Sequence, residues 1–243
     1  MKLILLTLTT VALVIVSPAA AQTIYTGHWD ITAVYEGGEL ELELGTHMPD
    51  GNGGETHVHY GLSSRTLQFG FGNSEGTAPA AKQNVTIGNT SLGNVWVSAA
   101  NGNSANLLNL PFLGFSAEEL GTGWTGNVTF TLKNLLYTGS GAGKLFLFED
   151  EDVFWNSTLT GANRGSFTVG VTQHDHGEFA FSDEGLYTLT LEVSGTYNNS
   201  LLTSEETTLN INVVPEPSSG ALLLAGMAAL AAVGRKIRRT VQV

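Results

Sequence analysis

Apolar and polar residues alternate over much of the chain, with the two-residue period of a strand that has one buried face. Trp29, Ile31 and Ala33 share one parity, and polar residues lie between them. Residues 39–44 alternate strictly between glutamate and leucine, after the glycine pair at 37–38. These two segments, joined by a glycine turn, predict a β-hairpin near the start of the chain.

The same period, or a short apolar run, recurs along the rest of the chain. Strands are expected at residues 56–60, 67–71, 95–97, 127–136, 144–148, 166–171, 178–181, 186–193 and 207–213. Short strands at a spacing of roughly 8–12 residues are typical of a β-sandwich. The sequence therefore predicts an all-β fold, a single antiparallel β-sandwich of the jelly-roll or immunoglobulin-like kind, over residues 22–213.

Three segments depart from this pattern. Residues 45–55 are expected to form a loop. Residues 72–94, rich in glycine, asparagine and alanine, receive no assignment. Ser116 followed by Glu119 has the spacing of a capping box, which predicts one helical turn at residues 117–120.

The first residues have the pattern of a secretory signal peptide. Lys2 is followed by an apolar run at residues 3–16 and then by small residues. Ala19 and Ala21 occupy the positions that a signal peptidase reads, so we expect cleavage after Ala21. The short apolar core argues against a permanent membrane anchor. Residues 1–21 are therefore excluded from the predicted fold.

The C-terminal segment, residues 214–239, has three parts. Pro215, Glu216 and Pro217 form a stiff break, because proline fixes φ and cannot donate a hydrogen bond. Residues 220–234 are uncharged and apolar, a run shorter than the ~20 residues of an ordinary spanning helix. A basic cluster follows: Arg235, Lys236, Arg238 and Arg239. We expect a short transmembrane helix with its basic end on the cytoplasmic side.

These three parts, in this order, resemble the PEP-CTERM sorting signal of Gram-negative bacteria. The signal also carries an ice-binding-protein C-terminal name, which does not imply ice binding here. The resemblance implies an inner-membrane intermediate, recognition and removal of the tail by an exosortase-type enzyme, and transfer of the body to the cell surface or extracellular matrix. It also associates the protein with exopolysaccharide.

Composition narrows the class of protein. The 243 residues include no cysteine, which excludes disulfides and thiolate metal sites, and 42% are hydrophobic, enough for a core. Outside the two terminal segments, the chain has five basic residues and 21 acidic residues. Such a surface repels phosphate backbones, so the sequence predicts no nucleic-acid partner.

Four of the six histidines form two His-x-His pairs: His57 with His59, and His174 with His176. On a strand, residues i and i+2 point to one face about 6.5–7 Å apart, so each pair can close on one metal ion. Imidazole and carboxylate ligands without thiolate suit zinc, copper or manganese. The alternative is that these are surface histidines of a polar β protein.

A third metal ligand would come from another strand. His28 and Asp30 have the same i, i+2 spacing on the first expected strand, and either can supply it. His47 falls in the expected loop after the glutamate-leucine strand.

Other motifs favour ordinary structure. The His57 to His59 segment lacks the glutamate that cupins place a few residues later. Residues 50–54 are interpreted as a glycine turn rather than a calcium loop, and the acidic residues 149–152 as a solvated loop tip. The four tryptophans are expected in the core rather than on a sugar-binding platform. No local motif of a nucleophilic enzyme appears.

Several short stretches resemble the choice-of-anchor M domain, also described as the actinobacterial surface-anchored protein domain. They span nearly the whole body, at residues 27–31, 110–114, 117–119, 128–132, 171–176, 179–181 and 185–187. Glu178 departs from the tryptophan usual in that family. Some members occur with transporters resembling metal-uptake systems. The resemblance therefore implies a metal-linked surface role, with His28, Asp30, His174 and His176 as the matching positions.

Together these observations predict an exported, non-enzymatic β-sandwich, displayed at the surface or in the matrix, that binds one transition metal ion through its histidines. An exopolysaccharide- or glycan-binding matrix module is the alternative, and a row of exposed aromatic residues would favour it. A metal-dependent enzyme using the same histidines is the third reading. An open coordination position beside a general base would favour the enzyme.

Overall fold

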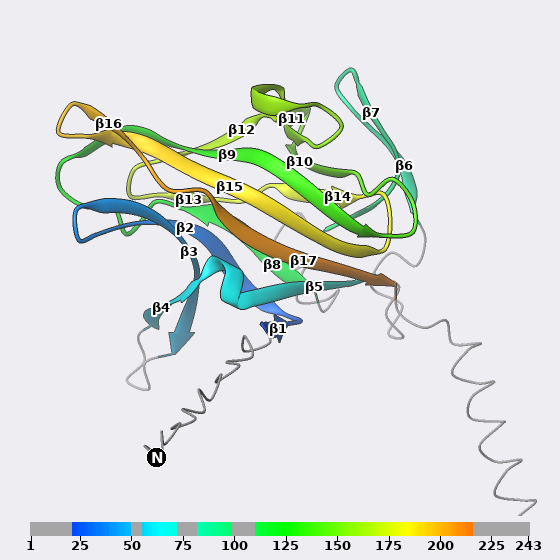
Figure 1. The fold of residues 1–243 in the computed structure, drawn as a ribbon, viewed down its shortest axis with the longest axis horizontal. Helices are drawn as coiled ribbons and strands as arrows, with labels where there is room; N and C mark the ends of the chain where they lie inside the picture. The colour runs from blue at the N-terminus through cyan, green and yellow to red at the C-terminus, as the bar shows by residue number, and fades with distance from the viewer. Residues whose placement is uncertain (1–20, 50–54, 72–81, 99–109, 216–243) are drawn as a thin grey trace, which may run out of the picture.

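The computed structural model describes residues 21–49, 55–71, 82–98 and 110–215, which form three β-sheets (Figure 1). The largest sheet has the order β1 (Gln22–Ile24), β5 (Arg65–Phe71), β17 (Thr207–Pro215), β15 (Gly185–Tyr197), β9 (Trp124–Gly139) and β12 (Ser166–Gly170), with β16 (Ser200–Thr203) paired to β15. The second has the order β11 (Asp152–Asn156), β10 (Leu145–Glu149), β14 (Glu178–Phe181), β7 (Thr90–Val97) and β6 (Gln83–Ile87). The third has the order β13 (His174–Asp175), β8 (Pro111–Ser116), β2 (Gly27–Glu36), β3 (Glu39–Pro49) and β4 (Glu55–Gly61).

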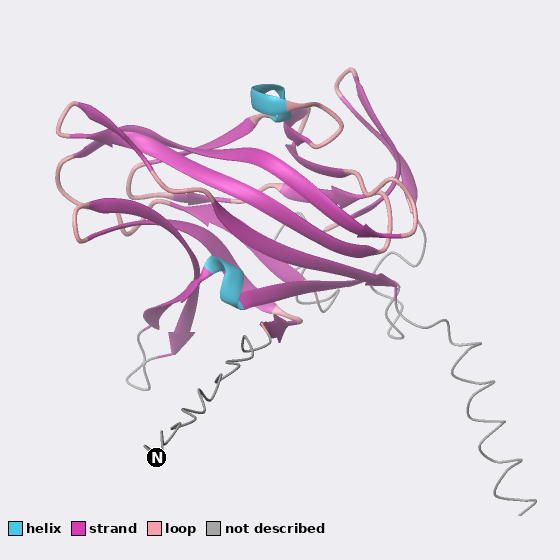
Figure 2. Cartoon of the chain, in the orientation of Figure 1, coloured by secondary structure: helices cyan, strands magenta, loops and turns pink. Residues whose placement is uncertain are grey.

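The predicted all-β fold is confirmed. Within the described part of the chain, the helical elements are two short 3₁₀ turns, η1 (Leu62–Ser64) and η2 (Gly161–Arg164) (Figure 2). Most strand pairs are antiparallel, as expected. Three pairs run parallel, namely β1 with β5, β5 with β17, and β2 with β8. Parallel neighbours require long crossover connections, which the alternation of residues does not reveal.

Both five-stranded sheets pack against the seven-stranded sheet around one hydrophobic core. The ring of Phe115 in β8 lies 4.8 Å from Phe167 in β12 and 6.2 Å from Phe179 in β14. Phe181 in β14 lies 5.3 Å from Phe69 in β5. Phe115 is fully buried, and truncation of such a side chain to alanine costs about 3–5 kcal/mol. The three sheets therefore form a sandwich-like arrangement.

Alternation positions the faces of β3. Leu40, Leu42 and Leu44 are buried against the core, while Glu41 is exposed on the other face. The strand does not end at residue 44. Its ladder with β4 continues to Pro49, so the predicted loop is wrong for residues 45–49. His47 therefore lies on a strand, on the same face as the glutamates.

The predicted helical turn at residues 117–120 is also wrong. The Leu120 N–H donates to the Ala117 carbonyl at 3.2 Å, which closes a single tight turn. The Ser116 hydroxyl accepts from the Glu118 N–H at 3.2 Å, but Glu119 points away, towards β4. The spacing of a capping box was present without the reciprocal hydrogen bond that defines one.

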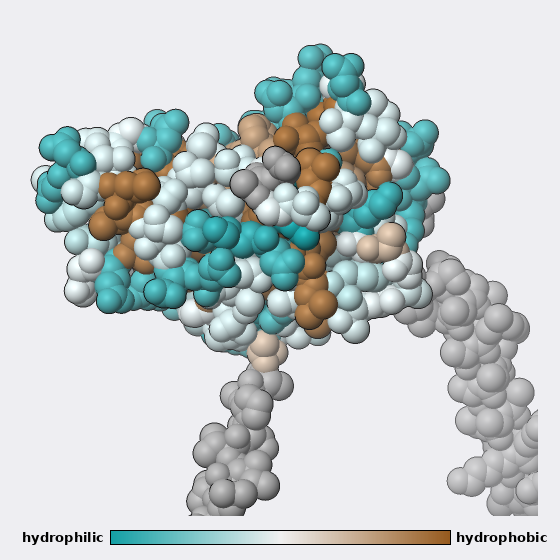
Figure 3. Space-filling view, turned by 45° about the horizontal axis from the view of Figure 1, so that its top comes forward, coloured by the Kyte–Doolittle hydropathy of each residue, from teal (hydrophilic) through white to brown (hydrophobic). Residues whose placement is uncertain are grey.

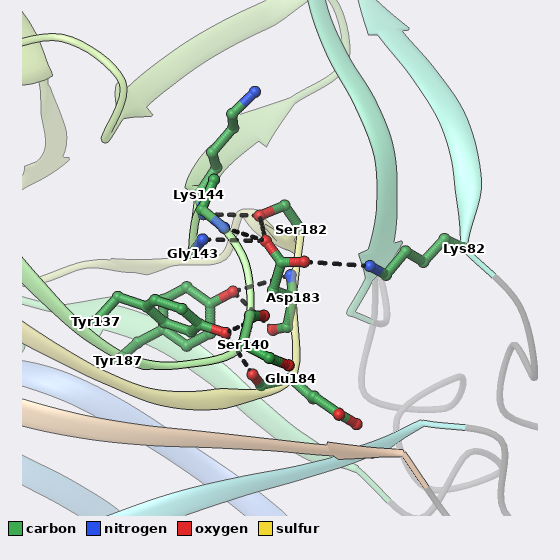
Figure 4. A network of polar contacts seen from close by, with 10 residues as sticks. Lys82, Tyr137, Ser140, Gly143, Lys144, Ser182, Asp183, Glu184 and Tyr187 are labelled. Carbon is green, nitrogen blue, oxygen red and sulfur yellow. Dashed lines mark hydrogen bonds and ion pairs between the residues drawn. The ribbon is translucent and has the colours of Figure 1, made fainter.

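The connection from β14 to β15 carries the chain from the second sheet to the first. The Tyr187 hydroxyl donates to the Asp183 carbonyl at 2.7 Å and accepts from the Asp183 N–H at 3.1 Å (Figure 4). A tyrosine that bonds the backbone a few residues upstream in this way is a tyrosine corner, a feature of β-sandwiches. The ring is fully buried, and burial raises the pKa of Tyr187, so the hydroxyl stays protonated as a donor.

The Asp183 carboxylate ties this corner to the segment between β9 and β10 (Figure 4). Its Oδ2 accepts from the N–H groups of Ala142 and Gly143 at 3.1 and 3.0 Å, and from the Ser182 hydroxyl at 2.7 Å. Its Oδ1 lies 3.5 Å from Lys82 Nζ. One carboxylate therefore holds three chain segments together.

Hydrophobic side chains are scattered over the described surface rather than gathered on one face. On the face shown in Figure 3, hydrophobic side chains form separate patches between hydrophilic ones. Trp96, Trp124 and Trp155 are buried and Trp29 packs against the core, as the sequence predicted. Among the described residues, Tyr25 is the aromatic side chain with more than half of its surface exposed.

The predicted terminal segments lie largely outside the described residues. These include the signal peptide with Ala19, and the apolar helix at 220–234 with its basic end. In the part of the chain that is described, no helix has the length and apolar character to span a membrane.

Candidate metal centre

The third sheet has one face in the core and one outer face. On β2, Ile31 and Ala33 are fully buried in the core, so His28 and Asp30 project from the outer face. The other strands of this sheet and the residue after β13 bring further histidines to that face: His47, His57, His59, His174 and His176. All six histidines of the chain therefore gather at one end of one sheet.

Strand register places two glycines beside Asp30. Asp30 pairs with Gly45 of β3 on one side and with Gly114 of β8 on the other. A Cβ on Gly114 would overlap both Asp30 Oδ1 and His176 Cε1. A Cβ on Gly45 would lie 2.6 Å from Thr32 Oγ1. Because glycine has no side chain, these two positions leave space in which polar groups from β2 and from the segment after β13 meet.

His28, His174 and His176 form the first group, in which one ring nitrogen of each lies within 4.8 Å of the others. His28 Nε2 is 3.1 Å from His176 Nε2. Phe112 stacks on His176 with ring centroids 3.9 Å apart, and Glu118 Oε1 lies 3.0 Å from His174 Nδ1. Such outer contacts fix the orientation of imidazole ligands.

The Asp30 carboxylate lies beneath this group. Its side chain is 3% exposed, with Oδ2 3.4 Å from His28 Nε2 and Oδ1 3.9 Å from His176 Nε2. Asp30 Oδ1 is buried without a hydrogen-bond partner. Buried polar atoms are almost always satisfied in folded proteins, so this carboxylate oxygen indicates a site that a further group completes.

The electrostatics of His176 favour the form that binds metal. Burial lowers the pKa of His176, and the neighbouring His28 and His174 lower it further, whereas Asp30 acts to raise it. The net effect is a lowered pKa, so the imidazole is neutral at neutral pH. A neutral imidazole has the free lone pair that a metal ion requires.

His57, His59 and Glu119 form a second group, again with ligand atoms within 4.8 Å of one another. Glu119 Oε1 lies 2.6 Å from His57 Nδ1 and 3.5 Å from His59 Nε2. Glu43 Oε2 lies 3.3 Å from His59 Nδ1 on the other side of that ring. This group combines two imidazoles with a carboxylate.

His47 lies between the two groups. Its ring is stacked on His28 with centroids 5.8 Å apart and lies 4.1 Å from His57. A cavity of about 10 Å³ is lined by residues of both sides, among them Asp30, His47 and His59. That is about the volume one water molecule or ion requires.

The structure thus divides the six ligands predicted from the sequence into two groups. It places His28, His174 and His176 together beside Asp30, and it places His57 with His59 elsewhere on the same face. Sequence reasoning missed the acidic residues of the 117–120 turn and His47. The alternation of side chains along β3 was a usable signal for His47. Residues 39, 41, 43, 45 and 47 all lie on one face of the strand.

Comparisons with known proteins identify the tail. Residues 213–239 match the family model of the PEP-CTERM protein-sorting motif. Searches among curated proteins and among solved structures gave no significant match. The motif begins in the last residues of β17, the final strand among the described residues. The chain therefore carries a PEP-CTERM sorting motif, which implies export, processing by an exosortase-type enzyme and sorting to the cell envelope or surface in Gram-negative bacteria.

Proposed function

We propose that this exported protein binds a transition metal ion at the cell surface through His28, His174 and His176, with Asp30 as the adjacent carboxylate. One observation carries the proposal. Three imidazole nitrogens from two separate strand segments lie within 4.8 Å of one another, beside a buried carboxylate oxygen that has no hydrogen-bond partner. A bound cation would supply the missing partner of that oxygen.

The ligand set favours zinc or copper over manganese. Imidazole ligands suit zinc and copper, whereas manganese prefers sites dominated by oxygen. Three imidazoles and one carboxylate match the tetrahedral coordination that zinc adopts. The strongly acidic body would concentrate cations near the site.

A binding role is favoured over catalysis by the shape of the surroundings. The cavity beside the histidines holds about 10 Å³, whereas sites for small organic molecules commonly measure roughly 300–1,000 Å³. A larger cavity of about 500 Å³ lies at the other end of the third sheet, lined by residues 38–42, 202–203 and 205–207 and by none of the histidines. We therefore propose a non-enzymatic protein.

The sequence also bears on the biological context of metal binding and on the alternative of glycan binding. The resemblance of the body to choice-of-anchor M proteins supports a link to metal uptake, although the family comparison matches the tail alone. The glycan-binding alternative is less favoured, because the tryptophans do not form an exposed sugar-stacking surface. Three of the four are buried and the fourth packs against the core.

Calorimetric titration tests the proposal. Full-length protein, expressed with its own export signal and without a histidine tag, is stripped with a chelator and titrated with ZnCl₂. We expect stoichiometric binding at the first group, weakened more than ~100-fold in the variant His174→Ala/His176→Ala, since both are direct ligands. Glu41→Gln, on the exposed face of the same sheet, is the matched control. Equal zinc affinity in all three proteins would refute the proposal.

A further inference from the structure

We infer that the centre holds two metal ions side by side, the second bound by His57, His59 and Glu119. This inference rests on the proposed function and extends it from one ion to two. The two ligand groups share no residue, so neither depends on the other for its ligands.

The second group is a complete ligand set. Two imidazoles at i and i+2 on β4 face the same way, and Glu119 Oε1 already lies within 2.6 and 3.5 Å of one nitrogen from each. Two histidines and a carboxylate are a common arrangement for zinc that keeps a position open. The Glu43 carboxylate lies 3.3 Å from the far nitrogen of His59, the position from which an outer carboxylate orients an imidazole ligand.

The two groups are neighbours across a single ring. His47 is stacked on His28 of the first group and touches His57 of the second. The small cavity is lined by Asp30, which contacts the first group, and by His57 and His59 of the second. The two ions would therefore lie on either side of His47 and Asp30.

Two divalent ions at such close range repel one another, and nearby negative charge must offset this. Four carboxylates can offset this repulsion, because each lies within 3.5 Å of an imidazole of one of the two ligand groups: Asp30, Glu43, Glu118 and Glu119. One deeply buried carboxylate lies between the groups, and three more surround them. The charge balance therefore favours two ions over one.

The turn at 117–120 connects the groups mechanically. Glu118 contacts His174 of the first group, and Glu119, the next residue, contacts His57 of the second. Two backbone hydrogen bonds tie the turn to the segment before β13. The Ala117 N–H donates to the Gln173 carbonyl at 2.8 Å, and the Thr172 N–H donates to the Ala117 carbonyl at 3.0 Å. An ion that fixes this turn at one group would also order the carboxylate at the other, so we expect positive cooperativity.

Metal stoichiometry tests the inference. The untagged full-length protein, loaded with Zn²⁺ and dialysed, should hold two equivalents per chain, and Glu119→Gln should hold one. Glu41→Gln, which removes an exposed carboxylate of the same sheet that belongs to neither ligand group, is the matched control and should keep both ions. A wild-type protein with one equivalent would overturn the second site while leaving the proposed function intact. No bound zinc would overturn the proposed function itself. Loss of the same ion in Glu41→Gln would also overturn the inference, because removal of any surface carboxylate would then explain the loss.

Electron paramagnetic resonance of the Cu²⁺-loaded protein tests whether the ions are adjacent. Two neighbouring Cu²⁺ ions broaden each other's signal, and the broadening should vanish in Glu119→Gln, leaving the spectrum of an isolated ion. Two sharp, independent signals in the fully loaded wild-type protein would show that the ions are far apart, which contradicts the geometry described above. Circular dichroism of each variant without metal confirms that the fold is intact.

Discussion

Asp30 Oδ1 and His176 Nε2 face each other at 3.9 Å in the space above Gly114. The two residues are 146 positions apart in the sequence, and β8 lies between the segments that carry them. Because β8 has no side chain at this point, a buried carboxylate and a buried imidazole can approach over its backbone. The absence of a side chain at Gly114 is therefore required for the geometry of the centre.

Gly114→Ala should disrupt the first metal group. The added methyl group would overlap Asp30 Oδ1 and the His176 ring, so these side chains would have to move apart, at a cost of about 1–3 kcal/mol in stability. We expect zinc affinity, measured by calorimetric titration, to fall at least tenfold.

Gly61→Ala is the control for that experiment. Gly61 lies at the end of β4 in the same sheet, has a φ of −51° and has nothing within 4 Å of its Cβ position. This variant should bind zinc like the wild type. Equal affinities in the two alanine variants would show that the space above Gly114 does not matter.

Tyr187→Phe should destabilise the fold without affecting the metal centre. The change removes both hydrogen bonds to Asp183 and leaves partly buried backbone groups without these partners, a loss of about 1–3 kcal/mol. Urea unfolding followed by circular dichroism measures the loss. Tyr25→Phe, at an exposed position, should leave the midpoint unchanged. A wild-type midpoint in Tyr187→Phe would mean that the corner contributes nothing.

Asp183→Asn should destabilise the protein in a pH-dependent manner. Burial acts to raise the pKa of Asp183, but hydrogen bonds from Ser182 and Gly143 and the charge of Lys82 outweigh it, so the pKa is lowered. A carboxyl group with a lowered pKa adds stability that is fully present above its unfolded value, near 3.8, and is lost as pH falls through the folded value.

The difference in unfolding free energy between wild type and Asp183→Asn should therefore be constant from about pH 5 to 8 and should shrink below about pH 4. Urea unfolding across this range measures it. A difference that grows on acidification would contradict the assigned sign.

Replacing the four basic residues after the apolar run with glutamine should block sorting. These residues are Arg235, Lys236, Arg238 and Arg239, and they lie within the matched motif. We expect positive charge to hold this end of the tail on the cytoplasmic side, so without it the tail should not be presented to the exosortase-type enzyme. Cell fractionation and intact mass should show an unprocessed, cell-retained chain. Normal release of this variant, as for a Lys133→Gln/Lys144→Gln control, would refute the role of the cluster.

The local pattern of the sequence predicted most of the longer strands, because one face of each is buried, but it missed β6, β8 and β11. Alternation in residues 39–44 and 186–193 reflects side chains that are now seen to be buried and exposed in turn. The pattern failed where β3 continues to Pro49. There the outer face is itself covered, so Gly45 and Thr46 are both buried and the alternation disappears.

The sequence could predict the histidine pairs but not their grouping. The i, i+2 spacing places His57 with His59, and His174 with His176, on one face each. Which pair meets His28 depends on sheet order, and β8 separates β13 from β2 through one antiparallel and one parallel pairing. Neither pairing is local, so no spacing rule could have joined His28 to His176 or His57 to Glu119.

Metal content by inductively coupled plasma mass spectrometry, on untagged full-length protein, tests the central claim most directly. The proposed function predicts at least one equivalent of bound zinc or copper per chain, and the two-ion inference predicts two. Both predict a loss of one equivalent when His174 and His176 are both replaced by alanine. Protein that holds no metal even after reconstitution, or a double variant that holds as much as the wild type, would contradict the proposed function.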